Sequence, residues 1–263
     1  PGKDRRDILA EWLTVKDNPY FASQFVDRVW AHFLGRGLVD PPDDVRVSNP
    51  PSHPQLRETL AAKFVEAGYD LRQLVRWVCN TRTYQRSSQT IPSNERDTRN
   101  FSHAMVRRLP AEALLDAVCQ VTGRPEKFKG LPLGARAAQV ADGQTGSYFL
   151  DVFGRPARTS ACTCERRDEP TLSQALHLIN GQTLSEKISH KEGRLARLLD
   201  ANEPPEQIIG DLYVAAYARR PTEAEQAALM KTLEGVEDNK QRRQILEDIY
   251  WAVLNSQEFV FHH

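Results

Sequence analysis

The chain has 263 residues, and its 35 Lys and Arg residues balance its 35 Asp and Glu residues. Hydrophobic residues make up 40% and charged residues 27%, a composition typical of a globular protein that buries a sizeable core. The zero net charge argues against wholesale binding to nucleic acid. No run approaches the roughly 18 to 20 apolar residues that a membrane-spanning helix needs, so we expect no membrane span.

The first third of the chain predicts helices. One should begin after Asn18, a suitable N-cap residue, with Pro19 in its first turn and Gly35 at its end. Its predicted core face consists of four apolar residues at a helical spacing: Phe21, Phe25, Val29 and Phe33. The next helix should follow Pro54, with a stripe of Leu56, Leu60 and Phe64. A third should use Leu71, Leu74, Val75 and Val78.

The remainder predicts more helices around an irregular middle. A helix should follow Pro110, and Thr222 with Glu225 matches the capping box that begins another. Residues 124–170 are rich in Gly and Pro, and residues 137–140 and 148–153 are candidate short strands. The predicted fold is therefore mainly α: an irregular multi-helix array with a loop-rich insert at about 124–170 and a small β element as an option within it.

The polar loop at residues 85–103 is the best candidate boundary within the chain. It would divide N-terminal helices at 1–84 from C-terminal helices and the insert at 104–263. Helices on both sides can also share one core, and we favour a single domain over 1–263. Because the chain begins with Pro1 and not Met, we expect this domain to be part of a longer protein.

The highest density of chemically versatile residues lies between residues 151 and 184. Cys162 and Cys164 are one residue apart, and Glu165 follows them directly. In the next predicted helix, His177 and Asn180 fall on one polar stripe. If that stripe faces the cysteine turn, thiol, carboxylate and imidazole groups would meet, as a metal or nucleophilic site requires.

Three interpretations of Cys162 and Cys164 remain open: structural thiols or a disulfide, a metal site, and a redox pair. The spacing is shorter than that of structural zinc sites, which also need a second pair of ligands. The alternative for His177 is a hydrogen bond to a loop carbonyl, and we favour this over catalysis.

A second candidate set consists of His32, Asp43, Asp44 and His53. Two imidazoles and two carboxylates are sufficient to hold a divalent metal ion. The spacing matches no compact metal motif, and carboxylates in such a loop more often cap turns. The chain has no Cys-x-x-Cys-His sequence, so we expect no haem site, and no Gly-rich phosphate-binding loop.

Other residues that could bind ligands have ordinary structural interpretations. The pairs Arg5–Arg6 and Arg107–Arg108 could hold an anion, but salt bridges are the expected role. All four tryptophans lie on predicted helices, so we expect them to pack in the core: Trp12, Trp30, Trp77 and Trp251.

Several long strings resemble one family: RRDILAEWLT, NPYFASQFVDRVWAHFLGRGLVDPPDDVRVSNPPSHP, GSYFLDVFGRP and CERRDEPTLSQALHLING. This is the planctomycete-type domain of unknown function that lies C-terminal to cytochrome-c-like and companion domains in large exported proteins. The resemblance implies an extracytoplasmic, periplasmic or secreted setting, and it implies those domains as partners within the same polypeptide. It implies no catalytic residues.

Two classes of function follow. The first, which we favour, is a non-enzymatic interaction or scaffold module that docks the cytochrome-like part, a partner protein or a polysaccharide. The alternative is a metal-dependent or redox-linked enzyme that acts on extracellular polysaccharide, and it would use the two candidate clusters above.

Overall fold

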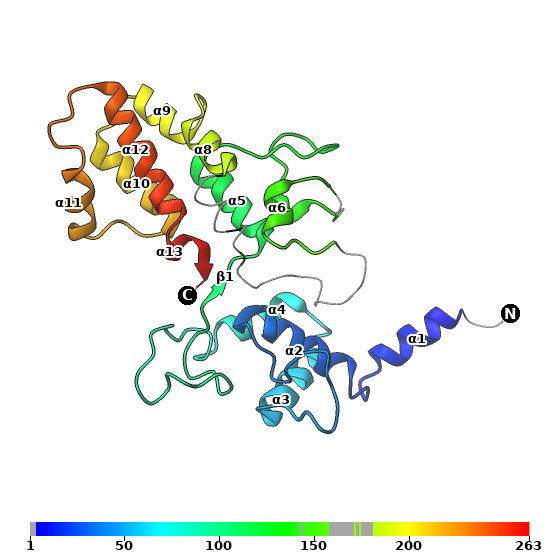
Figure 1. Cartoon of the computed structure of the whole chain (residues 1–263). Coiled ribbons are helices and arrows are strands. Elements are labelled where there is room, and N and C mark those ends of the chain that lie inside the picture. The colour runs from blue at the N-terminus through cyan, green and yellow to red at the C-terminus, as the bar shows by residue number, and fades with distance from the viewer. Residues whose placement is uncertain are drawn as a thin grey trace. The chain divides into compact units, whose positions relative to one another are not determined.

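The computed structural model describes residues 4–141, 143, 145–157, 171, 174 and 181–262, and they are mainly helical (Figure 1). The mainly α class predicted from the sequence is therefore confirmed. The chain divides into two compact units, of which the first ends at Arg107 and the second spans Arg108–His262. Each unit has its own cluster of buried apolar side chains.

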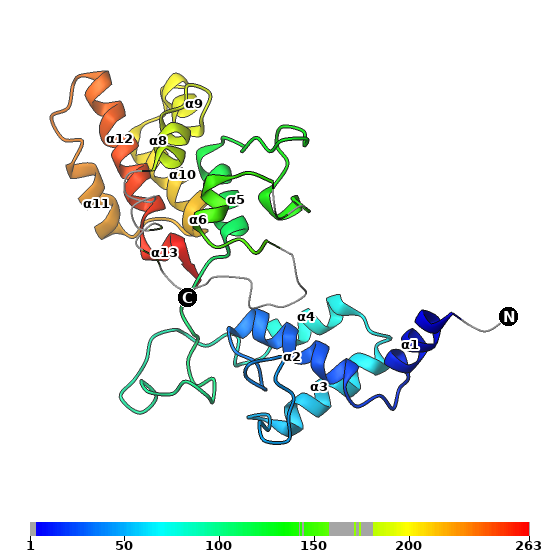
Figure 2. The same ribbon diagram turned by 45° about the vertical axis from the view of Figure 1, so that its right-hand side comes forward.

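The first unit contains four helices among its described residues: α1 (Arg5–Thr14), α2 (Phe21–Leu34), α3 (Pro54–Glu66) and α4 (Leu71–Cys79). The last three pack against one another, and their core includes Trp30, Leu60, Phe64, Leu74 and Val78. Helix α1 buries no residue and extends away from α2–α4 in both views (Figures 1 and 2).

Helix α2 ends at Gly35 as predicted, but it begins at Phe21 with Tyr20 as its N-cap, so Asn18 and Pro19 precede it, and its core face is displaced by one residue. The Asn18 carboxamide oxygen accepts hydrogen bonds from the backbone N–H groups of Tyr20 and Phe21, each 2.9 Å long. Gly35 ends the helix with a left-handed φ of 82°. The buried stripe is Ala22, Val26, Trp30 and Leu34, whereas the predicted stripe of Phe21, Phe25, Val29 and Phe33 is only partly buried.

The described helices of the second unit are α5 (Ala111–Thr122), α6 (Tyr148–Val152), α8 (Gln182–Ser189), α9 (Arg194–Asp200), α10 (Pro205–Tyr217), α11 (Glu223–Lys231), α12 (Asn239–Leu254) and α13 (Gln257–Val260). Helix α10 packs against both α5 and α12, and α8 also contacts α5 and α12 (Figure 2). Between the described residues of α5 and α6 lies one 3-10 turn, η1 (Ala137–Gln139).

The prediction of two short strands in the insert is wrong. Residues 137–139 form the 3-10 turn η1, because Asp116 accepts hydrogen bonds from the N–H groups of Ala137 and Ala138 at 2.6 and 3.3 Å. Residues 148–152 form α6, whose first turn is capped by Ser147. The described residues instead form one sheet of two short strands, β1 (Arg107–Arg108) and β2 (Phe261–His262), outside the insert.

Within the ranges described above, no helix combines the length and the apolar character that crossing a membrane requires.

Candidate functional site

The cysteine-centred candidates lie outside the described residues. This holds for Cys162, Cys164, Glu165, His177 and Asn180, so their proximity in space stays a prediction. The other two cysteines, Cys79 and Cys119, are free thiols that are partly buried in separate units. Burial raises the pKa of the Cys119 thiol, which disfavours the reactive thiolate.

The carboxylates of the second candidate set are engaged with arginines. Asp43 accepts from the guanidinium of Arg28, with Nη2–Oδ1 at 2.5 Å, and Asp44 accepts from that of Arg46, with Nη2–Oδ2 at 2.6 Å. The Asn49 side chain donates to the carbonyl of Asp44 at 3.1 Å. These contacts hold the loop between α2 and α3.

The histidines of this set contact aromatic rings. The ring centroid of His32 lies 5.2 Å from that of Phe33, and that of His53 lies 6.0 Å from Phe101. His53 Nδ1 is also 3.2 Å from the hydroxyl of Ser52. Among the described residues, no three His, Cys, Asp or Glu side chains are placed to hold a metal ion. The metal site at His32, Asp43, Asp44 and His53 thus gains no geometric support and stays a prediction.

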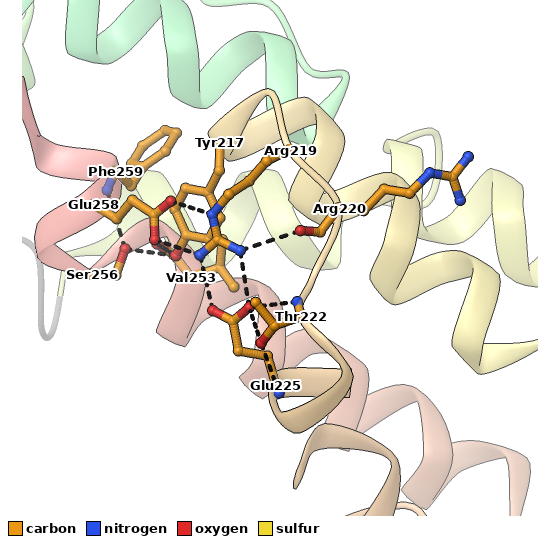
Figure 3. Close-up of polar contacts among 9 residues, drawn as sticks. All are labelled: Tyr217, Arg219, Arg220, Thr222, Glu225, Val253, Ser256, Glu258 and Phe259. Atoms are coloured by element: carbon orange, nitrogen blue, oxygen red, sulfur yellow. Dashed lines mark hydrogen bonds and ion pairs between the residues drawn. The ribbon is translucent and has the colours of Figure 1, made fainter. Parts of the chain in front are cut away.

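A dense polar network of the second unit surrounds Arg219, just after α10 (Figure 3). Its guanidinium pairs with Glu258 through Nε–Oε1 at 2.6 Å and with Glu225 through Nη2–Oε1 at 2.9 Å. It also stacks over the rings of Tyr213 and Tyr217, 5.4 and 5.3 Å from their centroids. Every nitrogen of the guanidinium has an acceptor, so the network offers a ligand no free donor there.

The role of this network is to join helix ends. Glu225 closes the predicted capping box, because it accepts from the Thr222 N–H at 2.7 Å while its own N–H bonds to the Thr222 hydroxyl at 3.3 Å. The hydrogen bond from Arg219 lowers the pKa of Glu225 to about 2. Glu258 belongs to α13, so one arginine links the starts of α11 and α13 to the end of α10.

Sequence reasoning missed a buried carboxyl group in the first unit. Asp27 of α2 is 0% exposed, and its Oδ1 accepts hydrogen bonds from the backbone N–H groups of Leu38 and Val39 at 2.7 and 3.1 Å. Its Oδ2 has no hydrogen-bond partner among the described residues. Burial raises the pKa of Asp27 above its usual value. The side chain therefore fixes the turn after α2, and because Asp27 lies outside the predicted core face, no local sequence pattern signalled its burial.

The second missed feature is the apolar surface of α1. Ile8, Leu9 and Trp12 are each more than 50% exposed, and Val15 directly after the helix is 48% exposed. The expectation that Trp12 packs in the core is wrong, whereas Trp30 is 1% exposed as expected. The spacing of Ile8, Trp12 and Val15 on one helical face was the available signal.

The second unit also contains a polar cavity of about 440 Å³, between the end of α9 and the first turns of α10 and α12. Its lining includes Asp200, Glu203, Arg242 and Arg243, so charges of both signs line one hollow. None of these residues belonged to a candidate cluster in the sequence, because the cavity joins segments about forty residues apart.

Of the paired arginines noted in the sequence, Arg107 and Arg108 bind carbonyl oxygens. Arg107 donates to the carbonyl of His32 at 2.8 Å and to that of Phe33 at 2.7 Å, which satisfies the C-terminal end of α2. Arg108 donates to the carbonyl of Phe153 at 3.0 Å. Arg6 pairs with Asp4 at the start of α1.

No curated protein and no solved structure matches the chain. A family model does: the one described as PSD1, protein of unknown function (DUF1553), matches residues 5–233. This span begins in α1 and ends after α11, so it covers most of the chain and extends through the first unit into the second, ahead of α12 and α13. The chain therefore belongs to the PSD1 family of proteins of unknown function (DUF1553).

Proposed function

We propose that this chain is a non-enzymatic interaction module that uses α1 to dock a cytochrome-c-like or companion domain of the same exported polypeptide. The observation that carries the proposal is the exposed apolar face of α1. Ile8, Leu9 and Trp12 are 53, 54 and 53% exposed, on a helix with no buried residue. Amphipathic helices with such faces commonly bind an apolar groove of a partner.

The C-terminal end of α1 is held by contacts that leave its apolar face open. The Tyr69 hydroxyl donates to the carbonyl of Thr14 at 3.0 Å, and the Asn18 side chain donates to that of Trp12 at 3.0 Å. At the other end, Asp4 caps the helix through the N–H of Arg6 at 2.9 Å. A helix that is ordered before binding loses less conformational entropy on docking, which favours affinity.

Trp12 is the expected anchor of this interface, because tryptophan is enriched among residues that dominate binding energies. We propose the cytochrome-c-like or companion domain as the partner because the sequence resembles an exported, cytochrome-associated module. The alternative function, a metal-dependent or redox-linked enzyme, would use the cluster at His32, Asp43, Asp44 and His53, where the described residues form no metal-binding group, or the cysteine cluster, which lies outside the described residues.

The test is a titration of the purified cytochrome-c-like neighbour domain against the whole chain by calorimetry. We expect saturable binding that Trp12→Ala weakens by about thirtyfold, since truncation of an anchor costs ~2 kcal/mol. Val214→Ala is the matched control, because Val214 is 50% exposed on α10 and should leave the affinity unchanged. Binding that ignores Trp12→Ala, or an absence of binding by every neighbouring domain, would contradict the proposal.

A further inference from the structure

The polar cavity of the second unit has the dimensions of a small-molecule site. Its volume of about 440 Å³ falls in the range that binding pockets usually occupy. Three segments form it: the end of α9 with the following loop, the start of α10, and the start of α12. Because they come from separate helices that share one core, the wall is held in place by packing.

Two carboxylates of this lining have no side-chain partner among the residues that the structure describes. Neither Asp200 nor Glu203 forms a side-chain hydrogen bond or ion pair with any residue that the structure describes. Both lie at the junction of α9 and α10, where Asn202 adopts a left-handed φ of 56°. They can therefore accept hydrogen bonds from an incoming cation.

Hydrogen bonds orient the two arginines of the lining but do not engage all of their N–H donors. Arg243 donates through Nε to Glu247 at 2.8 Å and through Nη2 to the carbonyl of Ser189 at 2.9 Å. Arg242 donates only through Nη2, to the carbonyl of Val236 at 3.0 Å. The Nε and Nη1 groups of Arg242 thus remain available to an anion, on a side chain that is already oriented.

The described arginines and carboxylates of this lining form no direct ion pairs with one another. All four charged residues lie in the described part of the chain, and no ion pair within 4.0 Å joins Arg242 or Arg243 to Asp200 or Glu203. A purely anionic ligand would meet the two carboxylates, and a purely cationic one would meet the arginines. A molecule that carries both charges satisfies both groups, and the partly exposed Leu199 of the lining offers apolar contact.

We infer that this cavity binds a small zwitterion of amino-acid to dipeptide size, with its carboxylate on Arg242 and its ammonium on Asp200 and Glu203. This binding activity goes beyond the proposed docking role and uses none of the residues of α1. The two proposals can therefore fail independently.

The experiment uses the whole chain and three probes: the dipeptide alanyl-leucine, its N-acetyl derivative and its C-terminal amide. Each is titrated calorimetrically. The zwitterionic dipeptide should bind saturably, and removal of either charge should weaken binding about tenfold or more, as expected for a lost charge-assisted hydrogen bond. Arg242→Gln should weaken binding of the free dipeptide to the level of its amide, and Asp200→Asn with Glu203→Gln should weaken it to the level of the N-acetyl form.

The matched control is Arg220→Gln, which removes the same charge from the same unit. The Arg220 side chain extends away from the network around Arg219 and does not line the cavity (Figure 3). This variant and Trp12→Ala should both bind the dipeptide like the unchanged chain. Absence of binding by all three probes would overturn the inference, as would equal binding of the capped and free dipeptides or binding that Arg242→Gln leaves intact.

Discussion

The buried carboxyl group of Asp27 should be a principal determinant of stability in the first unit. Asp27→Ala removes the acceptor of two backbone N–H groups, on Leu38 and Val39, which are 2 and 1% exposed. Both N–H groups are buried, so the loss of their acceptor is costly. Asp27→Asn keeps an acceptor oxygen at the position of Oδ1 and is therefore the matched comparison.

The magnitude follows from the hydrogen bonds. Each buried donor that loses its partner costs about 1–3 kcal/mol, so Asp27→Ala exposes the unit to a penalty of ~2–6 kcal/mol. The substitution also removes the cost of burying a carboxylate whose Oδ2 has no partner among the described residues, which offsets part of this penalty. We therefore expect a net loss of about 3 kcal/mol for Asp27→Ala, and a loss within about 1 kcal/mol for Asp27→Asn.

The assay is urea unfolding followed by tryptophan fluorescence in a Trp251→Phe background. Three tryptophans then remain, Trp12, Trp30 and Trp77, and all lie in the first unit. The signal therefore reports that unit alone. The reasoning is refuted if Asp27→Ala matches the unchanged chain in its unfolding midpoint, or if Asp27→Asn is as damaging as Asp27→Ala.

Three further predictions concern pH and backbone geometry. Burial raises the folded-state pKa of Asp27. Its contribution to the free energy of unfolding should therefore be complete below about pH 3.8 and should decline as the pH rises through the folded-state pKa. The difference in unfolding free energy between the unchanged chain and Asp27→Asn, measured as a function of pH, checks this. Because the pKa of Glu225 is lowered from 4.5 to about 2, its contribution to the free energy of unfolding should be present above pH 4.5 and lost as pH falls toward 2. Glu225→Gln should be about 1 kcal/mol less stable than the unchanged chain at neutral pH, a modest value because the ion pair is partly exposed, and this difference should disappear in an acid titration. A Cβ at Gly37 would lie 2.0 Å from the carbonyl oxygen of Val39, whereas one at Gly68 would meet nothing within 4 Å. Thermal melts should therefore show that Gly37→Ala is destabilised much more than Gly68→Ala, which costs only the strain of a positive φ, about 1 kcal/mol. Equal melting points of the two variants would contradict this geometry.

The sequence predicted helix ends better than helix faces. Gly35 and the Thr222–Glu225 capping box act locally, through hydrogen bonds within a few residues, and both are found as expected, whereas α2 begins two residues later than predicted from Asn18. The buried side of α2 depends on where α3 and α4 lie, and neighbouring stripes of α2 are both apolar. Periodicity alone could not distinguish Phe21–Phe33 from Ala22–Leu34, because the two stripes differ by one position.

The strands expected at residues 137–140 and 148–153 failed for a related reason. Short apolar runs fit either a strand or a helical turn, and distant partners decide between them. The side chain of Asp116, about twenty residues earlier, binds the start of η1. Similarly, the cavity at Arg242 and the exposure of Trp12 depend on tertiary packing, which no local motif encodes.

The most direct test of the docking proposal is hydrogen exchange of the whole chain, with and without a saturating amount of the cytochrome-c-like neighbour domain. The account predicts slower exchange for the amides of Arg5–Thr14 when the domain is bound, because docking of the apolar face suppresses opening of α1. The amides of α10 serve as the internal reference and should be unchanged. Equal exchange across α1 in the two states would contradict the account.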